Sequence, residues 1–178
     1  MTLKLGALAP QIDVDAYIRG DADPRRLTVG GPADTWTVLF FYPRDFTFIC
    51  PTELRGFADL QDDFAAEDAV LVAASTDSWH VHKAWFESAP ELASIRYPVA
   101  ADPAHALSRA YGVLADDGSA MRGTFVIDPA GRIRHASATD ESVGRNPHET
   151  LRILQALQTG ELCPVSWHPG QPTLRIAA

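Results

Sequence analysis

Cysteine is scarce in this sequence: its 178 residues include only Cys50 and Cys163. Two cysteines alone cannot form a zinc cluster, and the absence of a C-x-x-C pair argues against a redox motif of that type. A fixed structural disulfide is also uncommon in a reducing cytosol. The spacing therefore leaves two interpretations open, a catalytic or redox pair and two inert buried thiols.

A basic surplus and long apolar runs are lacking as well. The net charge is −8, from 15 basic and 23 acidic residues, and no Lys/Arg cluster stands against it, so we expect no nucleic-acid partner. No run approaches the ~20 apolar residues that a membrane helix needs, and residues 1–10 lack the apolar core of a signal peptide. With no internal repeat or linker, the sequence predicts one soluble, cytoplasmic domain with no membrane partner.

The surroundings of Cys50 indicate an activated thiol. The apolar run 38–41 predicts a buried strand that ends at Pro43, and Cys50 follows after a short loop. Pro51 suits the first position of a helix. A thiol at a helix N-terminus faces unpaired N–H groups and the positive end of the helix dipole, and both favour the thiolate. Thr47, three residues before the cysteine, can offer a hydroxyl.

Hydrophobic periodicity predicts strands and helices in alternation. The expected strands are 38–41, 69–74, 123–127 and 132–136, and the expected helices begin at Pro51, Ser78, Ala104 and Asn146. Residues 21–35 are rich in Gly, Pro and Asp and are expected to form a loop. This order predicts an α/β fold, with a central mixed sheet flanked by helices around a thioredoxin-like core.

Several motifs along the chain resemble those of typical two-cysteine peroxiredoxins of the alkyl hydroperoxide reductase C type. The family pattern P-x-x-x-T-x-x-C is met by Pro43, Thr47 and Cys50. Further matches are Phe46-Thr-Phe-Ile-Cys-Pro-Thr-Glu53, Ser75-Thr-Asp-Ser78, His82-Lys-Ala-Trp85, Arg122-Gly-Thr-Phe-Val-Ile-Asp-Pro129, Val143-Gly-Arg-Asn146 and Gly160-Glu-Leu-Cys-Pro164. The resemblance spans almost the whole chain and implies a thioredoxin-like fold with peroxiredoxin additions over residues 1–160, followed by a tail over residues 161–178.

The resemblance also implies a role for each matching residue. Cys50 is similar to the peroxidatic cysteine, and Cys163, in the tail, to a resolving cysteine that a partner subunit supplies. The residues that shield the thiolate and hold the peroxide are matched by Pro43, Thr47 and Arg122. The supporting ion-pair network around that arginine is matched by Glu53 and Arg145.

The implied reaction needs no metal and no bound organic cofactor. A thiolate attacks one oxygen of hydrogen peroxide or an organic hydroperoxide, and the resulting sulfenic acid condenses with a second thiol to a disulfide. An external protein dithiol then restores both thiols; a flavoprotein reductase, a thioredoxin-like protein and a C-x-x-C adaptor all remain open. The family implies antiparallel homodimers, which often close into decamers.

Each assigned residue also has a plain structural interpretation. Free cysteine is commonly buried and inert, and a thiol near a chain end is often an exposed, spare one. The other assignments have these alternatives: a loop hydrogen bond for Thr47, a strand end for Pro43, a favourable charge at a helix N-terminus for Glu53, a surface charge for Arg122 and a loop cation for Arg145.

Other chemistries are less favoured. His80 and His82 are two apart on an expected helix, where they do not share a face, so a metal site there is improbable. A Cys-His hydrolase would need a histidine beside Cys50, and none of the six histidines lies in a recognised partner motif. A thiol-disulfide oxidoreductase, and a peroxide sensor or holdase oligomer that does not turn over, remain as alternatives to the peroxidase.

Overall fold

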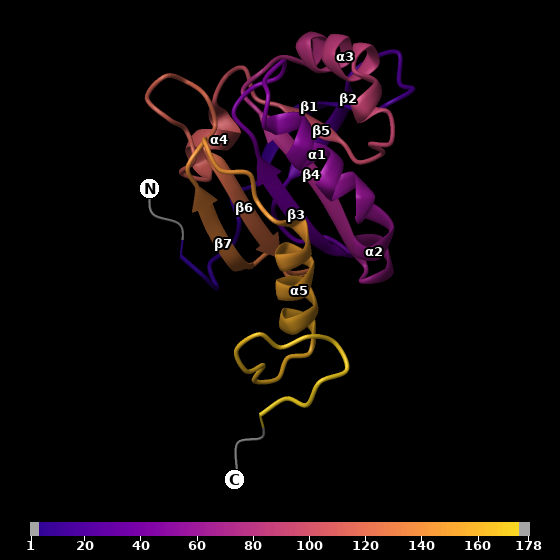
Figure 1. Cartoon of the computed structure of the whole chain (residues 1–178). Helices are drawn as coiled ribbons and strands as arrows, with labels where there is room; N and C mark the ends of the chain where they lie inside the picture. The colour runs from indigo at the N-terminus through magenta and orange to yellow at the C-terminus, as the bar shows by residue number, and fades with distance from the viewer. Residues whose placement is uncertain (1–3, 175–178) are drawn as a thin grey trace.

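The computed structural model of the chain describes residues 4–174. Figure 1 shows helices arranged around a central sheet, with the chain continuing past the last helix as an irregular segment. The strands are β1 (Ile12–Tyr17), β2 (Arg25–Val29), β3 (Trp36–Phe41), β4 (Ala69–Ser75), β5 (Val99–Ala101), β6 (Arg122–Ile127) and β7 (Ile133–Thr139). The helices are α1 (Cys50–Asp59), α2 (Gln61–Ala66), α3 (Trp79–Ser88), α4 (Ala106–Ala110) and α5 (Pro147–Gln158), with a short 3₁₀ turn, η1 (Pro90–Leu92).

The seven strands form one mixed sheet in the order β2-β1-β5-β4-β3-β6-β7. Its centre is parallel, since β3 pairs with β4 and β4 pairs with β5 in the same direction. The flanking pairs are antiparallel: β1 with β2 and β5 on one side, and β3 with β6 and β6 with β7 on the other. The expected α/β fold with a central mixed sheet is therefore confirmed.

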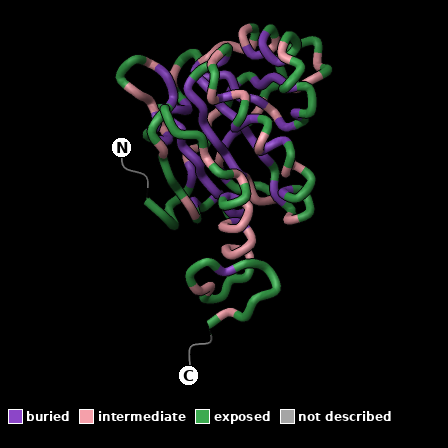
Figure 2. The backbone as a smooth tube through the Cα atoms, in the orientation of Figure 1, coloured by how far each residue is buried: buried purple, intermediate pink, exposed green. Residues whose placement is uncertain are grey.

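Strand β3 separates two hydrophobic cores because successive side chains of a strand point to opposite faces. Phe40 packs with Leu54 and Phe57 of α1, in a core that also includes α2, α3 and α5. Phe41 faces the opposite core, with Leu107 of α4 and strand β6. Figure 2 shows the buried backbone in the centre of the molecule, where β3 and β4 run, whereas the edge strands β2 and β7 are mostly exposed. Since β3 is covered on both faces, it is held rigidly in the core. The loop that leads to Cys50 begins at the carboxyl end of this strand.

Several expected boundaries need correction. Residues 21–35 are not all loop, because β2 forms there by pairing with β1. The helix expected from Pro51 begins at Cys50 and breaks at Leu60, so α1 and α2 are separate helices. Helix α4 is shorter than the segment expected from Ala104. Strands β1 and β5 were not anticipated.

The last helix begins as the sequence predicts. The side chain of Asn146 accepts a hydrogen bond from the N–H of His148, and Pro147 occupies the first turn. Beyond α5 the chain is mostly exposed (Figure 2). Trp167 is an exception within this segment: it is buried, and its indole Nε1 donates to the carbonyl of Gln171. The segment after α5 therefore packs mainly on itself and on the end of that helix.

Candidate active site

Cys50 is the first residue of α1, immediately beyond the loop that follows β3. Its side chain is buried, with 1% of its surface exposed, and it is a free thiol. No side chain caps the N-terminus of α1. The thiol therefore lies where the helix dipole presents partial positive charge.

A buried arginine faces the thiol from the neighbouring part of the sheet. Arg122 opens β6, and its Nη1 lies 3.6 Å from the Cys50 Sγ. Its Nε donates to the carbonyl of Glu141 at 2.8 Å, which fixes the plane of the guanidinium. Only 3% of Arg122 is exposed. A guanidinium stays protonated under all working conditions, so this is a permanent cation beside the sulfur.

Glu53 lies one helical turn after Cys50 and joins two arginines. One carboxylate oxygen pairs with Nη1 of Arg122, and the other accepts from Nε of Arg145 at 2.7 Å. The three side chains are almost wholly buried. Two guanidinium cations and one carboxylate leave this buried set with one uncompensated positive charge. The set therefore places net positive charge beside the Cys50 sulfur.

Arg145 is held more firmly than a loop cation would be. Its peptide N–H also donates to Glu53, at 2.8 Å, and its Nη1 donates to the carbonyl of Gly123 at 2.8 Å and the hydroxyl of Thr124 at 3.1 Å. The guanidinium carbon lies 5.6 Å from the centre of the Phe40 ring. Arg145 therefore links the first turn of α1, strand β6 and the entry to α5.

We expect Arg145→Ala to lower the free energy of unfolding by roughly 3–5 kcal/mol, because it removes one of the two guanidinium groups that pair with the buried Glu53 carboxylate and the donor to two acceptors of β6. Urea unfolding followed by circular dichroism measures this change. Arg109→Ala, on the exposed side of α4, is the matched control and should change stability by less than about 0.5 kcal/mol. Equal stabilities of the two variants would show that Arg145 does not brace the site.

The loop between β3 and α1 forms one wall of a cavity of about 240 Å³ that opens at Cys50. Its lining residues are Pro43, Thr47, Phe48, Ile49, Cys50, Arg122, Glu141 and Ser142. The Thr47 hydroxyl donates to the carbonyl of Arg44 at 2.9 Å. Pro43 and Thr47 thus lie at the same cavity as the thiol, while their roles toward a peroxide stay predictions.

A buried polar cluster that the sequence interpretation missed fixes the same loop. Asp45 accepts from the Tyr42 hydroxyl at 2.6 Å, and its second oxygen lies 2.7 Å from Nδ1 of His82 on α3. Its own N–H donates to Asp77, at 2.8 Å. Burial raises the pKa of the Tyr42 hydroxyl well above its usual value, and the Asp45 carboxylate adds to this rise. Asp77 and His82 belong to the segments Ser75–Ser78 and His82–Trp85, which match family motifs. That match is the one signal in the sequence that could have indicated that these residues hold the loop in place.

Cys163 lies at the far end of α5 from the site. Its Sγ is 3.5 Å from the Thr159 hydroxyl and 3.7 Å from the carbonyl of Ala156. The opposite end of α5 approaches α1 so closely that a Cβ on Gly56 would lie 3.1 Å from Cγ of Pro147. A helix of this length spans roughly 18 Å, at 1.5 Å per residue. The two cysteines of one chain are therefore not brought together.

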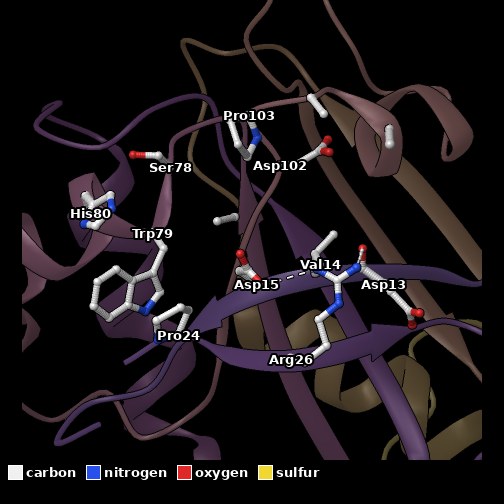
Figure 3. Close-up of a pocket in the computed structure, with 13 residues that line it drawn as sticks. Asp13, Val14, Asp15, Pro24, Arg26, Ser78, Trp79, His80, Asp102 and Pro103 are labelled. Atoms are coloured by element: carbon white, nitrogen blue, oxygen red, sulfur yellow. Dashed lines mark hydrogen bonds and ion pairs between the residues drawn. The ribbon is translucent and has the colours of Figure 1, made fainter. Parts of the chain in front are cut away.

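A second hollow, of about 330 Å³, lies between the N-termini of α3 and α4 and strands β1 and β2 (Figure 3). Trp79 and His80 line one side, and the Asp15–Arg26 ion pair lines the floor. Its lining includes no cysteine, so thiol chemistry belongs to the Cys50 cavity.

Among residues 4–174, no three His, Cys, Asp or Glu side chains gather in a way that could hold a metal ion. Within the same residues, no helix is long and apolar enough to span a bilayer.

Comparisons with known proteins agree with this geometry. A model of the AhpC/TSA family matches residues 5–136. The chain is 47% identical over 184 residues to alkyl hydroperoxide reductase C of Mycobacterium tuberculosis, covering 97% of this chain and 93% of that protein. It is 42% identical over 179 residues to peroxiredoxin prdx-2 of Caenorhabditis elegans, covering 96% and 88%. The reduced 2-Cys peroxiredoxin of Plasmodium vivax superposes with a TM-score of 0.90 at 29% identity, covering 97% and 93%, which confirms the expected thioredoxin-like fold.

Proposed function

The chain belongs to the AhpC/TSA family of thiol-dependent peroxidases, and we propose that it reduces hydrogen peroxide and organic hydroperoxides at Cys50. The observation that carries this proposal is the buried thiol at the head of α1 with the Arg122 guanidinium 3.6 Å from its sulfur. A peroxide needs a thiolate nucleophile and a donor beside the oxygen that leaves. Both groups face the same cavity.

The first step forms a bond between sulfur and one peroxide oxygen. The thiolate of Cys50 attacks the terminal oxygen, the O–O bond breaks, and its electron pair leaves with the other oxygen as hydroxide or alkoxide. That oxygen takes a proton to become water or an alcohol, and Cys50 becomes a sulfenic acid. Arg122 stabilises the charge that develops along the breaking bond. Thr47 supplies a hydroxyl at the cavity in addition to the Arg122 guanidinium. Pro43 limits access of water to the sulfur.

The second step joins Cys50 to Cys163 of a second copy of the chain. The Cys163 thiolate attacks the sulfenic sulfur, hydroxide leaves and becomes water, and a disulfide forms. The separation of the two cysteines along α5 favours a partner's thiol over the chain's own. The outer edge of β7 has no strand beside it within residues 4–174, and an open edge can pair with another copy. Because Cys50 is buried, the first turn of α1 must open for this step.

Turnover requires an external protein dithiol that reduces the disulfide. A flavoprotein reductase, a thioredoxin-like protein or a C-x-x-C adaptor has suitable chemistry. We propose a homodimer that closes into a decamer, in a reducing compartment such as the cytoplasm. In this account residues 1–160 form the peroxidase domain, and the tail over residues 161–178 delivers Cys163.

We expect Cys163→Ser to complete one fast oxidation by hydrogen peroxide and then to lose steady turnover with a protein dithiol, because no second thiol resolves the sulfenic acid. Stopped-flow oxidation and steady-state peroxide consumption measure the two steps separately. Peroxide-treated wild type should run as a disulfide-linked dimer on a non-reducing gel, and either single cysteine variant should run as a monomer. A wild-type monomer with both thiols consumed would place the bond within one chain.

A further inference from the structure

The loop over residues 43–49, which leads to Cys50, has an anchor in addition to the buried polar cluster described above. Nη2 of Arg44 donates to the carbonyl of Asp117 at 3.0 Å and lies 3.5 Å from its carboxylate Oδ2. Asp117 lies in the turn of a hairpin over residues 114–120. The contact therefore ties together two segments that are 73 positions apart in the sequence.

The Asp117 carboxylate is oriented by its own turn. Its Oδ1 accepts from the Ser119 hydroxyl at 2.6 Å and from the Ser119 N–H at 2.9 Å. These hydrogen bonds hold the pKa of the Asp117 carboxyl below its usual value. Its other oxygen, Oδ2, is the one nearest the Arg44 guanidinium. The turn thus presents an ionised and fixed carboxylate to the arginine.

The same hairpin leads directly into the strand that carries Arg122. It ends two residues before this arginine, which opens β6 and whose Nη1 lies 3.6 Å from the Cys50 Sγ. The loop 43–49 and Arg122 contribute different parts of the lining of the Cys50 cavity. A contact at Asp117 therefore joins these two parts of the cavity wall outside the cavity itself.

On the loop side, Arg44 also holds Thr47. The Thr47 hydroxyl donates to the Arg44 carbonyl at 2.9 Å, so its direction depends on where the backbone of Arg44 lies. Between the two residues, Phe46 has a left-handed φ of 56°, which is uncommon for a residue with a bulky side chain. Such a conformation persists only where its surroundings hold it. The anchor at Arg44 is one contact that can do so.

We propose, on the basis of the function proposed above, that Arg44 is a positioning residue for peroxide reduction. Its ion pair with Asp117 keeps the loop in register with β6, so that the Thr47 hydroxyl and the Arg122 guanidinium face the peroxide together. Arg44 is not among the described residues that line the cavity at the thiol. It therefore acts through Thr47 and does not touch the substrate.

The main test measures the rate constant of Cys50 oxidation by hydrogen peroxide in a single turnover. We expect Arg44→Leu to lower this rate constant roughly twofold to fivefold, because an exposed ion pair is weak and its loss loosens the loop without unfolding it. Asp117→Asn should act in the same direction, since its amide oxygen can still accept from Ser119. Arg44→Lys restores a cation and should recover most of the rate. The thiolate absorbance of Cys50 should keep its wild-type value in all three variants.

Ionic strength gives a second readout. The Arg44 and Asp117 side chains are 46% and 63% exposed, so added salt screens their attraction. Hydrogen peroxide is uncharged, and salt therefore does not act on its approach. We expect the wild-type rate to fall with added salt toward that of Asp117→Asn, and the rate of this variant to change less.

A double-mutant cycle with Thr47→Val tests the route of the effect. Arg44→Leu should have little further effect on the rate in the Thr47→Val protein, because the hydroxyl that it positions is already gone. The double variant Arg26→Leu/Asp15→Asn is the control, since it removes a similarly exposed ion pair from β1 and β2. It should keep the wild-type rate and salt dependence.

Wild-type rates in both Arg44→Leu and Asp117→Asn would overturn the inference. It would also be overturned if Arg44→Leu slowed the Thr47→Val protein as much as the wild type, or if it lowered the thiolate absorbance of Cys50. Circular dichroism shows whether each variant is folded, and Asp117→Asn leaves the loop sequence intact. A wild type that does not reduce hydrogen peroxide would instead overturn the proposed function.

Discussion

Cys50→Ser is expected to abolish peroxide reduction. A serine hydroxyl is scarcely ionised near neutral pH, so neither the dipole of α1 nor the Arg122 guanidinium can make it a competent nucleophile. The rate of hydrogen peroxide consumption with a dithiol donor should fall to that of the donor alone. The side chain is nearly isosteric, so the fold should persist, and circular dichroism checks this.

Cys163→Ser is the chemically matched control for this prediction, since it makes the same exchange outside the buried site. That variant should still consume one equivalent of peroxide per chain in a fast phase. Near-wild-type turnover by Cys50→Ser would mean that another group reduces the peroxide, and the mechanism proposed for Cys50 would be wrong.

Arg122→Ala should slow the oxidation of Cys50 roughly a hundredfold or more. The substitution removes the donor beside the sulfur and leaves Glu53 with Arg145 alone, so that the buried set no longer carries surplus positive charge. Loss of one preorganised donor to a developing oxyanion typically costs this much in rate. The rate constant in hydrogen peroxide and the ultraviolet absorbance of the thiolate at neutral pH are the two measurements.

Arg122→Lys separates charge from geometry in the same experiment. A lysine retains a cation but cannot donate to the Glu141 carbonyl, Glu53 and the sulfur in the fixed plane of a guanidinium. We expect it to recover only part of the rate. Arg132→Ala, on the exposed turn before β7, is the control and should leave the rate unchanged. A folded Arg122→Ala protein with wild-type rate and thiolate absorbance would remove this residue from the site.

The elements found from the sequence are those with strong local signals. The run at β3 and the turn between β6 and β7 identify buried strands and a hairpin without tertiary information. Strand β1 was missed although Ile12 and Val14 alternate with Asp13 and Asp15, a pattern typical of a half-buried strand. Strand β2 is mostly exposed and polar, and forms because β1 pairs with it. With three residues, β5 is too short for any period to be visible.

The residues of the candidate site also differ in whether local sequence alone can identify them. Cys50 could be identified locally, because a strand, a short loop and a helix start adjoin it in sequence. The pairing of Glu53 with Arg122 and Arg145 joins residues 69 and 92 positions apart, so only the resemblance to a family could suggest it. The contact between Asp45 and His82 depends on how α3 packs over the loop, and no periodicity encodes that contact.

Direct detection of the sulfenic acid tests the central claim most directly. The Cys163→Ser protein, treated with one equivalent of hydrogen peroxide in the presence of dimedone, is digested and analysed by mass spectrometry. This account predicts one dimedone adduct per chain, located on Cys50, and its loss in the variant that also carries Cys50→Ser. Consumption of the peroxide with Cys50 recovered as an unmodified thiol would contradict it.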